Sequence, residues 1–173
     1  MSIFFTADHH LGHTNIIRYC NRPFKDVDEM NEVMLERWNS VVSDEDIIYH
    51  LGDLVFNLKG KTYLPKLKGK IHLIKGNHDW KLNSEDKKRF ESIHKGFLRM
   101  EIERKRILLS HYKQTGLYVT DTDLFLYGHN HSVNKDVEKI DGVVRCNIGV
   151  DAWNFTPASW EDIREIYLQE KRK

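Results

Sequence analysis

Seven short apolar runs along the chain have the length and composition of β-strands. Each is rich in β-branched or aromatic residues and ends at a turn residue or at a histidine. Several lack an alternation of apolar and polar positions, which is typical of strands buried on both faces. The predicted strands are Ile3–Thr6, Ile47–Leu51, Ile71–Lys75, Leu98–Ile102, Ile107–Ser110, Leu124–Tyr127 and Val143–Ile148.

A helical pattern is clearest between the first two predicted strands. Apolar residues recur there at spacings of three and four, namely Val27, Met30, Val33, Met34, Trp38 and Val41. Asp26 precedes this stripe and Glu29 follows three residues later, which predicts a capping box. Shorter helices are predicted at Asn15–Cys20, Thr62–Leu67, Ser84–Ile93 and Ser159–Leu168, the last with Ser159 and Asp162 in capping-box positions. Strands and helices therefore alternate in the first half of the chain, which predicts an α/β protein.

Length and charge narrow the class of protein. The chain has 173 residues, without an internal repeat or a linker-like stretch, so we expect one domain over residues 1–173. Its 27 Lys and Arg nearly cancel 26 Asp and Glu, and the net charge of +1 argues against strong nucleic-acid binding. No apolar run has the length of a membrane span or a signal peptide, so no membrane association is expected.

Cysteine usage indicates a reducing compartment. Cys20 and Cys146 are the only cysteines in the sequence, and they are far apart and in no CxxC arrangement. Neither a disulfide framework nor a thiolate zinc site is expected, and a cytoplasmic location follows as the expectation.

Histidine is the residue type that points to chemistry. Most of the ten histidines lie next to Asp, Asn or Gly, directly after predicted strands. In open α/β sheets, ligands bind at the carboxyl ends of the strands. The segments concerned are Asp8-His9-His10, Gly52-Asp53, Gly76-Asn77-His78-Asp79, Ser110-His111 and Gly128-His129-Asn130-His131.

These segments offer many imidazole and carboxylate donors and no thiolate. In extended backbone, residues two apart point to the same side, so we expect Asp8 with His10, and His129 with His131, to present paired ligands. Such donors suit divalent ions such as Mn, Fe or Zn, and their number exceeds what one ion needs. Two divalent ions are therefore expected, most simply Mn, with Fe, Zn, Ni or Mg as alternatives.

The ordered motifs resemble those of the calcineurin-like metallophosphoesterases, whose pattern is DxH, GD, GNH[DE], a lone His and GHxH. All five occur in this order between Asp8 and His131. The resemblance implies a four-layer αββα fold, with two β-sheets flanked by helices and a dinuclear metal site on the loops at the strand ends.

The resemblance also implies a role for individual residues. Asp8, His10 and His131 would hold the first ion, Asn77, His111 and His129 the second, and Asp53 would bridge them, with a shared hydroxide as the nucleophile. His78 would contact the substrate and protonate the leaving oxygen, with Asp79 as its orienting partner.

Further candidates surround this set. His13, Asn15 and Arg22 follow the first motif, where small bacterial and phage members of the family look similar, and they are candidates for substrate binding; helix capping by Thr14 or Asn15 is the alternative. Asn147 and Asp151 either contact substrate, support the metal ions or cap a strand end.

The remaining histidines have other expected roles. His50 and His72 are expected to pack or to support the ligands, His94 to be solvated, and His9 to lie either behind the ligands or at the rim.

The expected activity is hydrolysis of a phosphomonoester or phosphodiester. The short chain leaves no room for a cap domain, which predicts an open site and favours nucleotides, nucleic-acid ends or phosphodiesters over a tightly enclosed metabolite. The expected partner is therefore a small phosphoester or nucleotide substrate. Two alternatives remain. The first is a non-catalytic scaffold on the same fold, against which the complete ligand set and His78 argue. The second is a protein phosphatase, which would need loops to hold a protein substrate, whereas the insertions in this chain are short.

Overall fold

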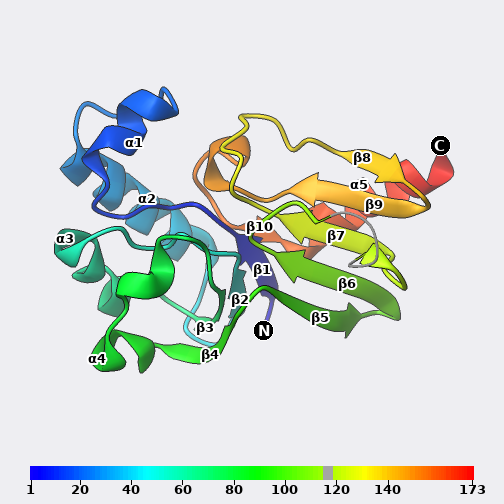
Figure 1. Cartoon of the computed structure of the whole chain (residues 1–173), viewed down its shortest axis with the longest axis horizontal. Coiled ribbons are helices and arrows are strands. Elements are labelled where there is room, and N and C mark those ends of the chain that lie inside the picture. Colours follow the sequence, from blue (N-terminus) through cyan, green and yellow to red (C-terminus); the bar gives the residue numbers. More distant parts are fainter. Residues whose placement is uncertain (115–118) are drawn as a thin grey trace.

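Two five-stranded β-sheets form the framework of the computed structural model, which describes residues 1–114 and 119–173 (Figure 1). The first sheet has the order β10-β1-β2-β3-β4 and the second has the order β5-β6-β7-β9-β8. The strands of the first sheet are β1 (Ile3–Thr6), β2 (Ile47–His50), β3 (Lys70–Ile74), β4 (Phe90–His94) and β10 (Ala158–Ser159). Those of the second are β5 (Phe97–Ile102), β6 (Lys105–Ser110), β7 (Leu124–Tyr127), β8 (Glu138–Ile140) and β9 (Val143–Asn147).

Parallel pairing brings the functional loops to one edge. Strands β1 to β4 run parallel in the first sheet, as do β6, β7 and β9 in the second. The two sheets meet just beyond their strand ends, where Ala7 forms a parallel bridge with Gly149. The segments that leave β1, β2, β3, β6 and β7 therefore converge on one region of the molecule.

The alternation of side chains along β1 explains how this strand serves two cores. Phe4 points into a cluster with Met34 and Trp38 of α2 (Val27–Val41), on the outer face of the first sheet. Phe5 points the other way, into a cluster that includes Leu109 and Leu126 of the second sheet. Both phenylalanines are buried, as expected for a central strand covered on both faces.

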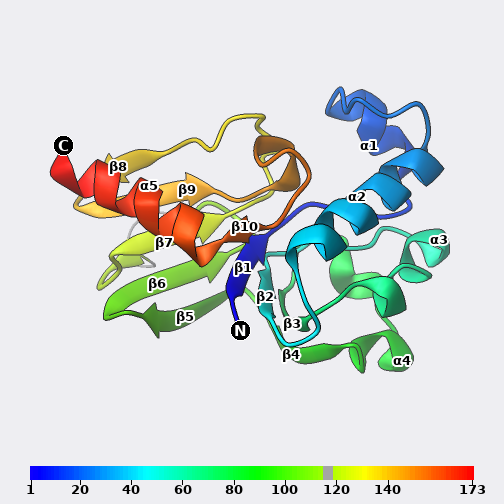
Figure 2. The ribbon, with the colours of Figure 1, turned by 180° about the vertical axis from the view of Figure 1, so that it is seen from behind.

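Two long helices flank the sheets. Figure 2 shows α2 along the first sheet and α5 (Trp160–Arg172) along the second, where Trp160 and Ile163 join the core between the sheets. The shorter helices are α1 (Thr14–Tyr19), α3 (Leu58–Lys61), α4 (Ser84–Lys87) and the single-turn 3₁₀ segments Leu64–Lys66, Asp79–Lys81 and Val150–Ala152. This architecture of two sheets flanked by helices confirms the fold expected from the sequence.

Most predicted elements are present, and the differences have physical causes. All seven predicted strands occur, with ends shifted by no more than two residues. The predicted helix Ser84–Ile93 is wrong beyond its first turn, because Phe90–His94 pairs with β3 as a fifth strand of the sheet. The predicted helix Thr62–Leu67 is reduced to the 3₁₀ turn Leu64–Lys66 around Pro65. The two- and three-residue strands β10 and β8 escaped prediction.

One of the two predicted capping boxes is complete, and the other is formed in part. Ser159 and Asp162 form the expected capping box of α5. At α2, the Asp26 carboxylate accepts hydrogen bonds from the amides of Asp28 and Glu29, but the Glu29 carboxylate accepts from Lys25 N rather than from Asp26 N.

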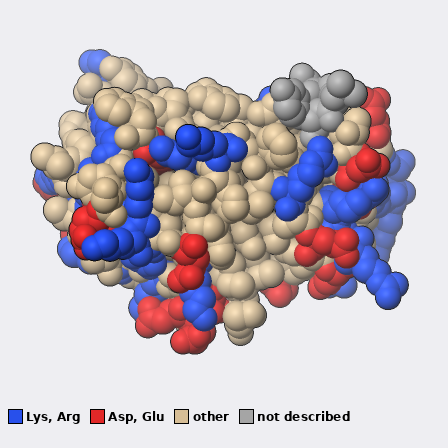
Figure 3. All heavy atoms as spheres, turned by 60° about the horizontal axis from the view of Figure 1, so that its bottom comes forward, with Lys and Arg blue, Asp and Glu red and all other residues tan. Residues whose placement is uncertain are grey.

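The distribution of charged side chains on the surface and the apolar character of the helices both bear on what the sequence predicts about binding partners and membranes. On the face drawn in Figure 3, acidic and basic side chains are interspersed rather than separated into one basic surface. Within residues 1–114 and 119–173, no helix is both long enough and apolar enough to cross a membrane.

Candidate metal centre

The donor residues lie on sharply turned backbone at the strand ends. Asp8, His10, Asp53, His129 and His131 all have positive φ, between 50° and 75°. The left-handed region is uncommon for residues other than glycine and is found where surrounding structure enforces it. The paired ligands are therefore brought together by turns, and the expectation that extended backbone aligns them is wrong.

One cluster of donors contains Asp8, His10 and His131. One ligand atom from each lies within 4.8 Å of the others. Asp8 and His10 are buried, whereas His131 is partly exposed. These are the three residues that the sequence assigns to the first ion.

A second cluster contains Asp53, His111 and His129, again with donor atoms within 4.8 Å of one another. The amide of Asn77 extends this cluster, because its Oδ1 lies 3.1 Å from His111 Nε2. The Nδ1 of His129 lies 3.0 Å from the same His111 nitrogen. All residues that the sequence assigns to the second ion thus converge.

Asp53 connects the two clusters. Its Oδ2 lies 3.5 Å from Nε2 of His10 in the first cluster and 3.5 Å from Nε2 of His111 in the second. His78 Nε2 lies 3.9 Å from the same oxygen, and His10, Asp53 and His78 form a third possible group of donors. By its position, His78 can therefore either bind a metal ion or face the substrate.

The chemistry of these donors fits divalent cations. His111 donates its Nδ1–H to the carbonyl of Leu51 at 2.7 Å, so its Nε2 presents a lone pair toward the lone pairs of Asn77 Oδ1. Among the described residues, the buried atoms without a hydrogen-bond partner include Asp8 Oδ1 and both ring nitrogens of His10. Buried acceptors that face one another are stabilised by a cation between them.

Burial also sets the protonation of the site. It lowers the pKa of His111 to about 4 and that of His10 well below its usual range, so both imidazoles are neutral, as metal ligands must be. Burial raises the pKa of Asp8 to about 7, against the opposing effects of His131 and the His129 amide.

His131 is oriented by Asp151. Its Nδ1–H donates to Asp151 Oδ2 at 3.1 Å, an arrangement typical of metal-ligating histidines. Burial alone would lower the pKa of His131, but the hydrogen bonds with Asp151 and Cys20 raise it to about 10, so an ion at this position would have to displace a proton from His131. Of the alternatives for Asp151, its hydrogen bonds to His131 and Arg22 favour support of the site. Asn147 instead caps the end of β9, because its side chain bonds Gly149 N and the carbonyls of Ser132 and Asn134.

Arg22 has a different place from the one expected of a substrate-binding residue. Its side chain is fully buried and donates to Asp151 and to the carbonyl oxygens of Asp8 and His9. The guanidinium is thus committed within the protein, where it supports the loop that carries Asp8 and His10.

Asp79 also differs from its expected role. Its carboxylate accepts from the amides of Asp53 (2.7 Å), Gly76 (2.8 Å) and Leu54 (3.2 Å). These bonds join the loops after β2 and β3, so Asp79 positions the backbone of Asp53 rather than the His78 imidazole. His78 is positioned by its own amide, which donates to Asp53 Oδ1 at 2.8 Å.

Close approach explains the glycine before Asn77. A Cβ at Gly76 would lie 2.2 Å from Asp53 Oδ1 and 2.8 Å from Asp53 N. Because Asp53 connects both clusters, any side chain at position 76 would displace it. The glycine before Asp53 has a different reason: Gly52 has φ of +94°, which side chains rarely adopt.

His13 precedes α1 and lies near His78, and Asn15 is in the first turn of α1. The His13 ring stacks on Phe56, with centroids 3.7 Å apart, and lies 6.2 Å from the ring of His78. Asn15 is exposed. His13 is the residue before α1, and its side chain makes no capping hydrogen bond with this helix.

The other histidines are structural. His9 and His50 are fully buried behind the site and share a hydrogen bond of 2.9 Å. His72 and His94 both contact Ser92 Oγ, and His94 is the last residue of strand β4, where it is partly exposed.

One residue at the site escaped the sequence analysis. Tyr112 follows His111, and its hydroxyl lies 3.3 Å from Asn77 Oδ1. The only available signal was its position beside a ligand candidate, because the contact with Asn77 joins segments 35 residues apart.

Comparisons with known proteins agree with this geometry. The model of the calcineurin-like phosphoesterase superfamily domain matches residues 1–159. An uncharacterized protein of Methanocaldococcus jannaschii is 33% identical over 177 residues, which cover 99% of this chain and 93% of that protein.

Solved structures are similar as well. A protein of unknown function from Aquifex aeolicus is 27% identical and covers 95% of this chain and 98% of its own, with a TM-score of 0.74. An archaeal phosphodiesterase is 22% identical and covers 86% of this chain and 84% of its own, with a TM-score of 0.53, which shows a common fold.

Proposed function

Because the chain belongs to the calcineurin-like phosphoesterase superfamily, we propose that it is a metal-dependent hydrolase of phosphomonoesters or phosphodiesters with a dinuclear centre. The observation that carries this proposal is the shared carboxylate of Asp53. It lies 3.5 Å from a donor nitrogen in each of the two clusters. A carboxylate in this position can be shared by two neighbouring cations, which favours one dinuclear centre over two independent metal sites.

The proposed ligands divide into two sets that share Asp53. Asp8, His10 and His131 hold the first ion, and Asn77, His111 and His129 hold the second. We propose that both ions are manganese, with Fe, Zn, Ni or Mg as alternatives. When bound, two such ions supply a nucleophile from water at neutral pH and withdraw negative charge from a phosphoryl group.

His78 is the proposed proton donor to the leaving oxygen. Its side chain is 30% exposed, whereas Asp53 beneath it is 2% exposed, so the imidazole can meet a substrate that enters from solvent. Its amide bond to Asp53 Oδ1 fixes it relative to the bridging carboxylate. A positioned imidazole of this kind accelerates departure of a poor leaving group by about 10²- to 10⁴-fold.

The substrate proposed is a small phosphoester or nucleotide. His13 contributes the edge of an aromatic wall, since it stacks on Phe56, whose ring lies 5.2 Å from that of His78. We place the organic part of the substrate along this wall, beside the proton donor. Asn15 is exposed on the same segment and is the second proposed substrate contact.

The test is hydrolysis of a substrate panel by protein that has been stripped with a chelator and then reloaded. The panel contains p-nitrophenyl phosphate, bis-p-nitrophenyl phosphate, linear and cyclic nucleotides and short oligonucleotides, each with Mn²⁺, Zn²⁺, Ni²⁺ or Mg²⁺. Asp53→Asn is the test variant. Asp123→Asn is its matched control, because Asp123 pairs with Arg106 away from the site.

We expect activity only in the reloaded wild type and control, with two ions per chain by elemental analysis. Activity that survives exhaustive chelation would contradict the proposal. Protein that holds two ions and hydrolyses no member of the panel would favour the non-catalytic scaffold instead.

A further inference from the structure

Tyr112 lies at the open side of the second cluster of donors. Its ring packs edge-on against the rings of His129 and His111, with centroids 4.6 and 4.8 Å away. The side chain is nevertheless 42% exposed. The buried imidazole of His111 and the exposed imidazole of His129 therefore fix the direction of the phenol, while part of Tyr112 remains accessible to solvent.

The hydroxyl of Tyr112 is only weakly engaged. It donates to Asn77 Oδ1 over 3.3 Å, whereas a well-formed O–H···O bond measures about 2.7 to 2.8 Å. The same Asn77 oxygen lies 3.1 Å from His111 Nε2, within the second donor set. A phenol is protonated at neutral pH and is a good donor, so this O–H group is available to a stronger acceptor.

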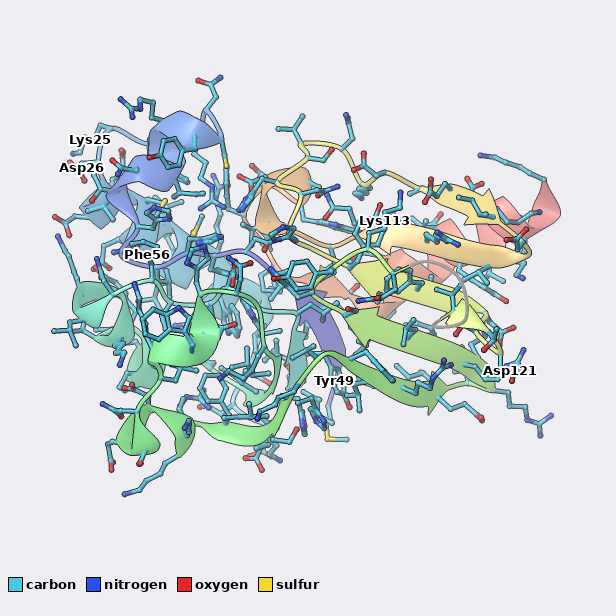
Figure 4. All side chains as sticks on the ribbon, viewed as in Figure 1. Lys25, Asp26, Tyr49, Phe56, Lys113 and Asp121 are labelled. Carbon is cyan, nitrogen blue, oxygen red and sulfur yellow. The ribbon has the colours of Figure 1, made fainter. Side chains whose placement is uncertain are left out.

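Tyr112 and His78 lie on different sides of the site. His78 is next to the first cluster and the aromatic wall, with its ring 5.1 Å from that of His10 and 5.2 Å from that of Phe56. Tyr112 contacts Asn77, His111 and His129, which belong to the second donor set. In Figure 4, Phe56 lies on the α3 side of the strand ends, and Lys113, which follows Tyr112, lies on the β7 and β9 side.

We propose that the Tyr112 hydroxyl donates a hydrogen bond to a non-bridging oxygen of the substrate's phosphoryl group and so holds this group over the second metal position. The inference rests on the proposed phosphoesterase function and adds a substrate contact beside the second cluster to those proposed above. A phosphate oxygen carries negative charge, so it is a stronger acceptor than the Asn77 amide.

The substitution Tyr112→Phe tests this role, because it removes the hydroxyl and retains the ring that packs on His111 and His129. Tyr63→Phe is the matched control: the Tyr63 hydroxyl donates a hydrogen bond to Glu32 on α2, away from the donor clusters. A lost hydrogen bond to a charged group reduces kcat/KM by about 10- to 100-fold.

Two readouts accompany the kinetics. Elemental analysis gives the ion content, and calorimetric titration with inorganic phosphate gives the affinity of the Mn²⁺-loaded protein for the phosphoryl group alone. We expect Tyr112→Phe to retain its ions and to lose phosphate affinity by about the same factor as kcat/KM, and Tyr63→Phe to match the wild type.

Two results would overturn the proposal. The first is unchanged phosphate affinity and kcat/KM in Tyr112→Phe. The second is a loss of bound metal with normal phosphate affinity at saturating Mn²⁺, which would show that the hydroxyl only positions Asn77. Because phosphate binding needs no turnover, the comparison remains decisive even if no substrate of the panel is hydrolysed.

Discussion

The guanidinium of Arg22 and the carboxylate of Asp151 form a buried ion pair, with Nε 2.8 Å from Oδ1 and Nη2 2.9 Å from Oδ2. Both side chains are at most 2% exposed. The same carboxylate accepts the Nδ1–H of His131, and the same guanidinium donates to the carbonyl oxygen of Asp8. This ion pair therefore supports two residues of the first donor cluster: Arg22 holds the backbone at Asp8, and Asp151 holds the ring of His131.

Loss of the Asp151 charge should weaken the first metal site. In Asp151→Asn, His131 loses its charged acceptor and with it part of its orientation and basicity. Substitutions of this kind reduce metal affinity by about 10- to 100-fold. Titration of the apo protein with Mn²⁺ should show this loss for one of two sites. Asp123→Asn, which removes the partner of the half-exposed Arg106, is the control and should bind both ions normally.

Removal of the Arg22 charge should destabilise the fold itself. Arg22→Gln leaves Asp151 buried without its counterion, which costs about 3 to 5 kcal/mol in the free energy of unfolding. Arg106→Gln breaks an exposed pair with Asp123, which solvent screens, and should cost much less. Urea unfolding of the two apo variants measures both values. Equal losses would show that burial of the Arg22 pair is unimportant.

The Arg22 pair also shows where sequence reasoning ends. The ligand candidates could be predicted because each follows an apolar strand directly and parallel strands end at a common edge. Arg22 and Asp151 are 129 residues apart, and neither position has a local feature that indicates its partner. Asp79 is similar, since its three backbone partners lie on two loops that meet only in the folded chain.

The errors in secondary structure have the same origin. Ser84 begins a helical turn with a capping box from Asn83 and Asp86, as local sequence favours. The following residues are taken into the sheet by pairing with β3, and this tertiary gain outweighs a short helix. Local pattern likewise predicts extended backbone at Asp8 and His10, whereas their positive φ is imposed by contacts such as Asp8 N to Gly52 O.

Acid should reveal the contribution of Asp46 to stability. Its carboxylate accepts hydrogen bonds from Ser2 N at 2.6 Å and from Ser43 N and Oγ, which join the starts of β1 and β2. These bonds lower the pKa of Asp46 to about 2, and the bond from Ser2 N has the largest effect. Because the folded pKa is below the unfolded value of about 3.9, the stabilisation is complete above that value and is lost as the pH falls toward 2.

The variant Asp46→Asn should therefore be less stable than the wild type at pH 7. The difference in the free energy of unfolding should shrink as the pH falls from about 4 to about 2. Asp44→Asn, at an exposed neighbouring position, is the control. A difference that is independent of pH over this range would show that the charge of Asp46 is not what the three donors stabilise.

Metal removal should leave the fold in place. The two main clusters of buried apolar residues contain Trp38 and Ile71 in one and Phe5 and Leu126 in the other, and neither cluster contains a proposed ligand. A core of this kind does not depend on a metal as a zinc finger does. Chelated protein should unfold cooperatively in urea, at a lower midpoint than loaded protein. A gradual transition without a midpoint would contradict this expectation.

The role of His78 separates metal binding from proton transfer. His10, Asp53 and His78 form one of the possible donor groups, so His78 could hold an ion. Its 30% exposure and its distance of 3.9 Å from Asp53 Oδ2 instead favour contact with substrate. Asn77, the neighbouring residue, supplies the comparison, because its Oδ1 lies within the second donor set.

We predict that metal content and turnover separate at His78 and fall together at Asn77. In His78→Asn, both ions should remain while kcat falls by about 10²- to 10⁴-fold, as expected when a general acid is lost. The deficit should be smaller for p-nitrophenyl substrates, whose leaving group hardly needs a proton, than for alkyl phosphoesters. In Asn77→Ala, elemental analysis should show loss of one ion together with activity. A His78 variant that loses metal in proportion to its activity would identify His78 as a ligand.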